Sequence, residues 1–171
     1  IEPTYQAINR TEKLAIANIE SIVVAGSLLF DKKINKSTNI IPVDSEHNAI
    51  HKLLNYVNYK NLKTITLTAS GGPFLNASIK DLANATLEEA LKHPTWVMGK
   101  KITIDSAALI NKGLELIEAT YLFDMSHKNI IILVHPQSLI HAMVSMYDGT
   151  TMSLMSKADM RIPISDAIKK L

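Results

Sequence analysis

The stretch that decides the fold of this chain is Asp105-Ser106-Ala107-Ala108-Leu109-Ile110-Asn111-Lys112-Gly113-Leu114-Glu115. It follows residues 101–104, an apolar segment that we interpret as a strand. Asp105 or Ser106 is a good helix cap, so the stretch predicts a strand that runs directly into a helix. Apolar residues then recur at helical spacing and predict one buried stripe made of Ile110, Leu114, Ile117 and Tyr121.

The opposite face of this predicted helix carries Asn111, Lys112 and Glu115. An amide, a cation and a carboxylate therefore share one patch. One interpretation is a solvated helix face with an (i, i+3) ion pair between Lys112 and Glu115. The other is a functional site, and polar clusters elsewhere in the chain favour it.

Composition narrows the class of protein. The chain has 171 residues, of which 47% are hydrophobic and 20% are charged, so it can bury a core. The net charge is +2 with both signs interspersed, which does not favour nucleic acid as a partner. Cysteine is absent, which excludes disulfides and thiolate catalysis. No apolar run reaches the length of a membrane span, and we expect the chain to be a segment of a longer protein.

Strands and helices alternate along the chain, and a hairpin follows them. The patterns predict a helix at 4–9, a second helix that ends at 29 and a third at 46–56. They predict strands at 13–17, 40–43 and 64–68, a loop at 32–39 and a glycine-rich turn at 69–74. Thr86 and Glu89 predict a capping box for a short helix that ends near His93. A buried strand is expected at 130–134, and Asp148-Gly149 predicts a hairpin between 140–147 and 150–155. The fold class is α/β, with a mixed sheet flanked by helices and a C-terminal β-hairpin.

Carboxylates at a strand end predict a metal site. Asp44 and Glu46 are two residues apart after a strand, so in extended chain they project from the same side, and Glu115 is the candidate for a third ligand. A set of oxygen ligands suits Mg²⁺ or Mn²⁺. A competing zinc site would combine His47 and His51 with Glu46. An N-cap with an exposed acid is the alternative without any metal.

Small polar residues beside glycines predict an anion site. Ser70 precedes the glycine pair 71–72, where backbone N–H groups can approach a phosphate. Ser106 at a helix start and Lys112 could donate to the same anion.

A lid is expected at 94–99. This loop is bounded by proline and glycine, follows His93 and carries the chain's single tryptophan, Trp96. The alternative is that Trp96 is simply packed in the core.

Five segments together resemble the 1-deoxy-D-xylulose 5-phosphate reductoisomerase family, in order and in approximate spacing. They are 42–49, 70–74, 93–101, 105–115 and 135–138. The resemblance implies an enzyme of isoprenoid precursor biosynthesis, in the methylerythritol phosphate pathway, that rearranges a sugar phosphate and reduces the product with NADPH. It also implies a homodimer that uses Mg²⁺, Mn²⁺ or Co²⁺.

The resemblance assigns functional roles to residues of this chain by their positions in the matching segments. It makes Asp44, Glu46 and Glu115 the metal ligands. It implies that the sugar phosphate contacts are Ser45, Glu46, Ser70, His93, Trp96, Ser106, Asn111, Lys112 and Glu115, with Trp96 and Met98 in a mobile loop. It implies that Glu46, His93, Lys112 and Glu115 take part in catalysis, and that Asn18, Glu20 and Gly99 touch NADPH.

Residues 1–38 are then expected to be a remnant of a Rossmann-like nucleotide-binding domain, and 39–171 the catalytic, metal-binding and dimerisation domain. The family's glycine-rich fingerprint does not precede Asn18, and its C-terminal helical domain does not follow. Ile19 stands where the family has lysine, and Ala108 where a hydroxyl is usual. One alternative is therefore a non-catalytic relative, a sugar phosphate-binding dimerisation module. A weaker one is a metal-dependent isomerase or aldolase that needs no nucleotide. We expect the protein to act in the bacterial cytoplasm, or in a plastid if its source is eukaryotic.

Overall fold

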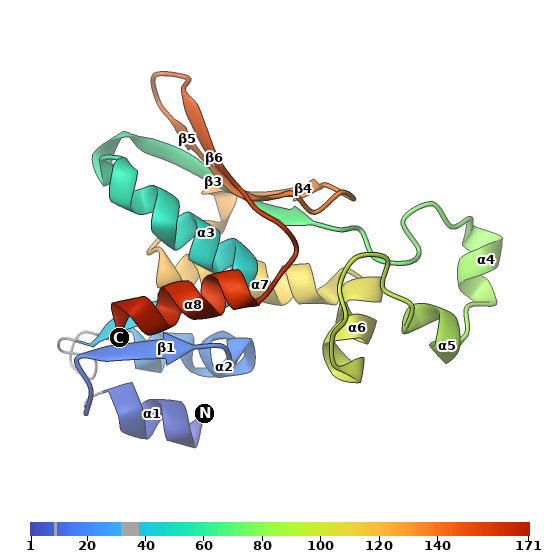
Figure 1. The fold of residues 1–171 in the computed structure, drawn as a ribbon, viewed down its shortest axis with the longest axis horizontal. Coiled ribbons are helices and arrows are strands. Elements are labelled where there is room, and N and C mark those ends of the chain that lie inside the picture. Colours follow the sequence, from blue (N-terminus) through green and yellow to red (C-terminus); the bar gives the residue numbers. More distant parts are fainter. Residues whose placement is uncertain (9, 32–37) are drawn as a thin grey trace.

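The computed structural model describes residues 1–8, 10–31 and 38–171 (Figure 1). The described strands form two sheets, a parallel pair β1-β2 and a four-stranded sheet in the order β4-β3-β5-β6. The predicted helix end at residue 9 and most of the predicted loop 32–39 lie outside the described residues.

The N-terminal part is a βαβ unit with one preceding helix. Its elements are α1 (Glu2–Ile8), β1 (Lys13–Ile16), α2 (Ile19–Leu29) and β2 (Asn39–Pro42). β1 and β2 are parallel, with Leu14 opposite Ile40. α2 crosses between them, as parallel strands require. Ile8, Ala25 and Leu29 form a small core of their own in this unit.

The four-stranded sheet is mixed, as the sequence predicts. Its strands are β3 (Leu62–Ala69), β4 (Ile130–Val134), β5 (Ile140–Met146) and β6 (Thr151–Met155). β3 is parallel to β4 and antiparallel to β5, and the hairpin β5-β6 turns at Asp148 and Gly149, where Gly149 has a positive φ of 90°. The predicted hairpin is confirmed.

The main core lies between this sheet and two helices, α3 (Ser45–Leu53) and α7 (Ile110–Leu122), on one of its faces (Figure 1). Ile50 of α3, Ile65 and Leu67 of β3, Ala119 of α7 and Val144 of β5 are all fully buried there. The short 3-10 turns η1 (Leu54–Tyr56), η2 (Tyr59–Asn61) and η3 (His127–Asn129) lead into or out of these elements. The helices predicted to flank the sheet thus include α3 and α7 on this face.

The prediction that 130–134 is a buried strand is half wrong. These residues do form β4, but only Ile130 is buried, and Leu133 is 46% exposed. β4 is an edge strand, so one side of it has no neighbouring strand in the described chain.

Short helices joined by turns and loops lie between β3 and α7. α4 (Ile79–Ala83) and α5 (Leu87–Ala90) extend away from the rest of the molecule (Figure 1), and each begins with a capping box, which is the predicted Thr86–Glu89 pair in α5. The predicted strand 101–104 is wrong, because these residues belong to α6 (Lys100–Ala107). An (i, i+4) ion pair between Lys101 and Asp105 supports this helix.

The helix predicted to start at Asp105 or Ser106 instead breaks in two. α6 ends at Ala107, Leu109 adopts a left-handed conformation with φ 58°, and α7 begins at Ile110. The predicted buried stripe is wrong as well. Ile110 is 56% exposed, whereas the buried side chains of α7 are mainly polar, namely Lys112, Glu115 and Glu118 with Ala119.

The C-terminal helix α8 (Arg161–Lys170) was not predicted. It lies beside α3 (Figure 1), where Asp166 accepts a hydrogen bond from Asn48 and pairs with Lys52 and Lys170. In the described part of the chain, no helix is long and apolar enough to cross a membrane.

Candidate active site

A cavity of about 250 Å³ opens where β2 and β3 end and where α3 and α7 begin. The loop 94–99 and the end of α6 form its other walls. The cavity is lined by all ten residues predicted for the metal and the sugar phosphate, which are Asp44, Ser45, Glu46, Ser70, His93, Trp96, Ser106, Asn111, Lys112 and Glu115. The fold therefore brings together side chains from five separate segments.

Asp44 and Glu46 reach the cavity by a different geometry from the one expected. Asp44 is the N-cap of α3 and accepts hydrogen bonds from the backbone N–H groups of Glu46 (3.0 Å) and His47 (3.2 Å). Glu46 lies in the first helical turn and accepts a hydrogen bond from Ser45 Oγ at 2.8 Å. The predicted extended backbone is wrong here, although both carboxylates do line the cavity.

The polar face of α7 supplies the opposite wall. Lys112 Nζ pairs with Glu115 and lies 4.0 Å from Glu46 Oε2, and Asn111 Nδ2 also donates to Glu115. Lys112 is 8% exposed and Glu115 is 2% exposed, so this patch is not a solvated helix face. Burial raises the pKa of Glu115 well above its ordinary value, and the carboxylate of Asp44 adds to this effect. Burial opposes the charge of Lys112, but Glu46 and Glu115 outweigh it and raise the pKa of the ammonium.

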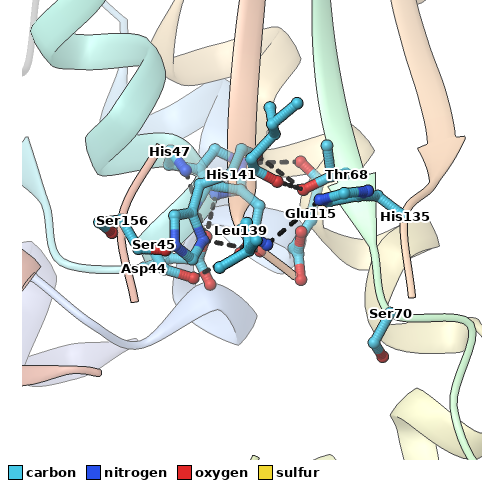
Figure 2. Close-up of polar contacts among 12 residues, drawn as sticks. Asp44, Ser45, His47, Thr68, Ser70, Glu115, His135, Leu139, His141 and Ser156 are labelled. Atoms are coloured by element: carbon cyan, nitrogen blue, oxygen red, sulfur yellow. Dashed lines mark hydrogen bonds and ion pairs between the residues drawn. The ribbon is translucent and has the colours of Figure 1, made fainter. Parts of the chain in front are cut away.

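His47 connects the two walls. Its Nδ1 lies 2.9 Å from Asp44 Oδ1, and its Nε2 lies 2.9 Å from the backbone oxygen of Glu115 (Figure 2). Both partners can only accept hydrogen bonds, so both ring nitrogens must carry protons and the ring is an imidazolium. Burial disfavours this charge, but Glu118 and Asp44 raise the pKa of His47 to about 10. The same ring lowers the pKa of Asp44 against the effect of that residue's own burial.

Candidate metal ligands lie at this junction. Among the described residues, Asp44, His47 and Glu115 each carry a possible ligand atom, and these atoms lie within 4.8 Å of one another. His47 would have to release a proton before it could bind a metal. The competing zinc set is not brought together, because the Nδ1 of His51 faces Lys170 Nζ at 3.1 Å on the α8 side. The carboxylate set of Asp44, Glu46 and Glu115 shares the cavity and stays a prediction.

Ser70, the anion-binding candidate beside the glycine pair, lies apart from this cluster, beyond the end of β3 (Figure 2). Ser70 Oγ lies 2.9 Å from His93 Nε2 and accepts a hydrogen bond from the backbone N–H of Gly72 at 3.2 Å. Gly72 has a positive φ of 69°, and a Cβ at this position would lie 2.8 Å from the backbone oxygen of Ser106. Only glycine lets the turn pack against the end of α6 in this way.

Known proteins match this chain in sequence and in fold. A family model described as the 1-deoxy-D-xylulose 5-phosphate reductoisomerase C-terminal domain matches residues 40–123. The reductoisomerase of Sulfurihydrogenibium sp. strain YO3AOP1 is 53% identical over 168 residues, which is 98% of this chain and 44% of the relative. That of Clostridium acetobutylicum is 50% identical over 97% of this chain and 43% of the relative. The chain belongs to the 1-deoxy-D-xylulose 5-phosphate reductoisomerase family.

Solved reductoisomerase structures agree with this assignment. A crystal structure in complex with NADPH, fosmidomycin and magnesium superposes with a TM-score of 0.90 at 42% identity, and covers 96% of this chain and 43% of its own. The Zymomonas mobilis reductoisomerase in complex with NADPH gives a TM-score of 0.86 at 44% identity, and covers 96% of this chain and 42% of its own. The chain therefore spans less than half the length of the reductoisomerases that it matches.

The residues that the reductoisomerase resemblance assigns to NADPH lie outside the cavity wall. Asn18 caps α2 by accepting a hydrogen bond from the backbone N–H of Ser21 at 2.8 Å. Glu20 pairs with Lys101 at 2.8 Å, and Gly99 is the N-cap of α6. The two neighbours of Asn18 in the chain, Ala17 and Ile19, line the cavity instead.

Two further residues of the site were missed in the sequence. Glu118 is 2% exposed and lines the cavity, and its Oε2 lies 3.5 Å from His47 Nδ1 with no hydrogen-bond partner. Burial raises the pKa of Glu118 to about 7. His141 of β5 is buried with its Nδ1 3.9 Å from Glu46 Oε1. The (i, i+3) spacing from Glu115 could have indicated Glu118, but no local pattern indicated His141.

Proposed function

We propose that this chain carries the metal and sugar phosphate site of a 1-deoxy-D-xylulose 5-phosphate reductoisomerase. That enzyme would convert 1-deoxy-D-xylulose 5-phosphate to 2-C-methyl-D-erythritol 4-phosphate with NADPH and a divalent metal. The observation that carries the proposal is that one cavity is lined both by carboxylates that can hold a metal and by donors that can bind an anion. The carboxylates are Asp44, Glu46 and Glu115, and the donors are Ser70, Ser106, Asn111 and Lys112, of which Asn111 and Lys112 contact Glu115 directly.

The donor set fits a hard divalent cation. Asp44, Glu46 and Glu115 would hold Mg²⁺ or Mn²⁺, with Co²⁺ also possible, because these ions accept carboxylate oxygens. In the ligand-free chain, Lys112 and His47 supply the positive charge against the same carboxylates. When bound, the metal would polarise neighbouring oxygens of the sugar and stabilise negative charge that develops on them.

The chain's own residues have separable roles in this proposal. The Ser70 hydroxyl, the Asn111 amide and the Lys112 ammonium would bind the phosphate group, because they are hydrogen-bond donors that line the cavity. Ser45 holds Glu46 through its hydroxyl. Trp96 would exclude water from the reacting centre, because it lines the cavity from the loop 94–99.

The relatives support the assignment of cofactors. One solved reductoisomerase was crystallised with NADPH, fosmidomycin and magnesium, and this chain superposes on it over 96% of its length. We infer that NADPH approaches from the side of Asn18, Glu20 and Gly99. We also infer that residues 1–38 belong to the nucleotide-binding domain and 39–171 to the catalytic domain, and that the protein acts in the bacterial cytoplasm.

A homodimer is part of the proposal. Ile131 and Leu133 of β4 lie on the sheet face opposite the core, and each is 46% exposed. Met155 of β6 lies on the same face and is 62% exposed. An uncovered apolar face of this kind suits a second copy of the chain. Sedimentation of Leu133→Glu as a monomer beside a dimeric wild type would support this, and a monomeric wild type would contradict it.

Calorimetry tests the site directly. Mn²⁺ should bind the chain with saturation, and fosmidomycin should then bind more tightly than it does without metal. Glu115→Gln should abolish Mn²⁺ binding, whereas Glu88→Gln, which changes an exposed carboxylate on α5, should not. Absence of Mn²⁺ binding to the wild-type chain would refute the metal site.

One observation favours the non-catalytic alternative. Ile19 lines the cavity at the position where the resemblance expects a lysine. Loss of a charge-assisted hydrogen bond costs about 1.5 to 3 kcal/mol, or roughly 10- to 150-fold in affinity or rate. If that loss limits the protein, Ile19→Lys should raise fosmidomycin affinity by a factor in this range. An unchanged affinity would remove the argument from Ile19.

A further inference from the structure

His93 holds together two parts of the cavity wall that are distant in the chain. Its Nδ1 accepts hydrogen bonds from the backbone N–H groups of Thr95 (3.1 Å) and Trp96 (2.9 Å). Its Nε2 lies 2.9 Å from the hydroxyl oxygen of Ser70. The two backbone donors require a lone pair on Nδ1, so the ring is neutral and its single N–H is on Nε2. Burial lowers the pKa of His93, which favours the same neutral form.

This tautomer determines the direction of the Ser70 hydroxyl. Ser70 Oγ accepts one hydrogen bond from His93 Nε2 and another from the backbone N–H of Gly72 at 3.2 Å. A serine oxygen has two lone pairs and one proton. Both lone pairs are therefore used, and the hydroxyl can only donate. Because Ser70 lines the cavity, its proton is available to an anion bound there.

The same ring fixes the position of Trp96. The two backbone donors that Nδ1 accepts belong to the loop 94–99, and the indole ring packs against His141 at a centroid distance of 6.2 Å. Trp96 and Ser70 both line the cavity. One imidazole thus controls the loop through one nitrogen and the anion donor through the other.

We propose that His93 is a positioning residue that couples the loop 94–99 to anion binding. Its Nδ1 holds the loop against the cavity, and its Nε2–H turns the Ser70 hydroxyl toward the anion. The identity of that anion as the phosphate group of the substrate rests on the proposed function. The hold on the loop does not depend on it.

Two variants separate the two nitrogens. In His93→Asn, the side-chain oxygen occupies the place of Nδ1 and can still accept from Thr95 and Trp96, but nothing reaches Ser70. In His93→Gln, the amide N–H occupies the place of Nε2 and can still donate to Ser70, but the acceptor for the loop is lost. Both variants remove the ring and its packing, so a difference between them reports the hydrogen bonds.

Trp96 is the chain's single tryptophan and reports on the loop directly. Acrylamide quenching of its fluorescence in the ligand-free chain should rise about twofold in His93→Gln and stay at the wild-type level in His93→Asn. Inorganic phosphate should bind His93→Asn and Ser70→Ala about two- to tenfold more weakly than the wild type, because a neutral hydrogen bond is lost.

The outcomes are distinct. Equal quenching in both His93 variants would overturn the hold on the loop. Phosphate binding that weakens in Ser70→Ala but not in His93→Asn would overturn the control of the hydroxyl. A wild-type chain that shows the expected quenching pattern but binds no phosphate would support the hold on the loop and refute the proposed function.

Discussion

Lys112 is the cation whose removal should affect this fold most. Its ammonium group is buried between Glu115, with which it pairs, and Glu46 at 4.0 Å. Lys112→Met keeps much of the aliphatic volume but leaves these carboxylates without their counter-charge. Removal of one partner of a buried ion pair costs about 3 to 5 kcal/mol. That range is an upper limit here, because Glu115 can escape part of the cost by taking up a proton.

The size of the effect should therefore depend on pH. Burial already raises the pKa of Glu115 in the folded chain above its ordinary value of 4.5, and loss of Lys112 would raise it further. A folded-state pKa above the unfolded one stabilises the fold fully below the unfolded value, and this stabilisation disappears as pH rises through the folded value. Lys112→Met should be only mildly destabilising near pH 5. The wild type loses stability in the same way up to its own folded pKa of Glu115, so the gap between the two proteins should widen, by up to about 1.4 kcal/mol per pH unit, from that pKa to the higher one of the variant.

Urea unfolding in metal-free buffer at about pH 5, 6, 7 and 8 measures this difference in the free energy of unfolding. Lys92→Met is the matched control, because Lys92 forms an exposed (i, i+4) pair with Glu88. Such a pair contributes only about 0.5 kcal/mol. A free-energy difference between Lys112→Met and the wild type that stays constant across these pH values would refute the argument from Glu115.

Other positions give further predictions. Gly72→Ala should destabilise the chain by more than about 1 kcal/mol, because φ is 69° and the added Cβ would lie 2.8 Å from a backbone oxygen. Gly113→Ala should stabilise it by up to about 1 kcal/mol, because a Cβ at this position inside α7 meets nothing within 4 Å. Urea titrations measure both changes. Leu109→Gly should raise the melting temperature, because Leu109 holds a left-handed φ of 58°, and a lowered value would show that its side-chain contacts outweigh the strain. His47 has a pKa raised to about 10, so its contribution is complete below its unfolded value near 6.5 and disappears as pH rises through about 10. The difference in stability between the wild type and His47→Gln should therefore become smaller as pH rises from about 6.5 to about 10. Thermal unfolding at pH 7 to 10 would measure it.

Local signals in the sequence predicted the elements that depend on local chemistry. Asp148-Gly149 specified the hairpin, because its turn needs a residue with positive φ. Thr86 and Glu89 specified the start of α5 through a reciprocal cap. The ten residues predicted for the metal and the sugar phosphate also line one cavity. These predictions succeeded because each rests on neighbours within a few residues, or on a motif longer than chance allows.

Predictions that needed tertiary context failed. Residues 101–104 are rich in β-branched side chains and look like a strand, yet the segment forms α6, where Thr103 Oγ1 donates to the backbone oxygen of Gly99 and Lys101 pairs with Asp105. β4 is as apolar as a buried strand, yet no strand of the described chain pairs with its open edge. An apolar segment is more stable when it is buried, but its sequence does not show which element will cover it.

The burial of the polar face of α7 shows why periodicity misjudged this helix. A helix normally buries its apolar stripe, because an unpaired charge in the core is costly. α7 can bury Lys112, Glu115 and Glu118 because α3, more than 60 residues earlier, brings Asp44, Glu46 and His47 to meet them. Two cations then lie among four carboxylates, so neither helix is stable in this position without the other. The candidate active site is therefore also a part of the core, and substitutions in it should change the free energy of unfolding as well as ligand affinity.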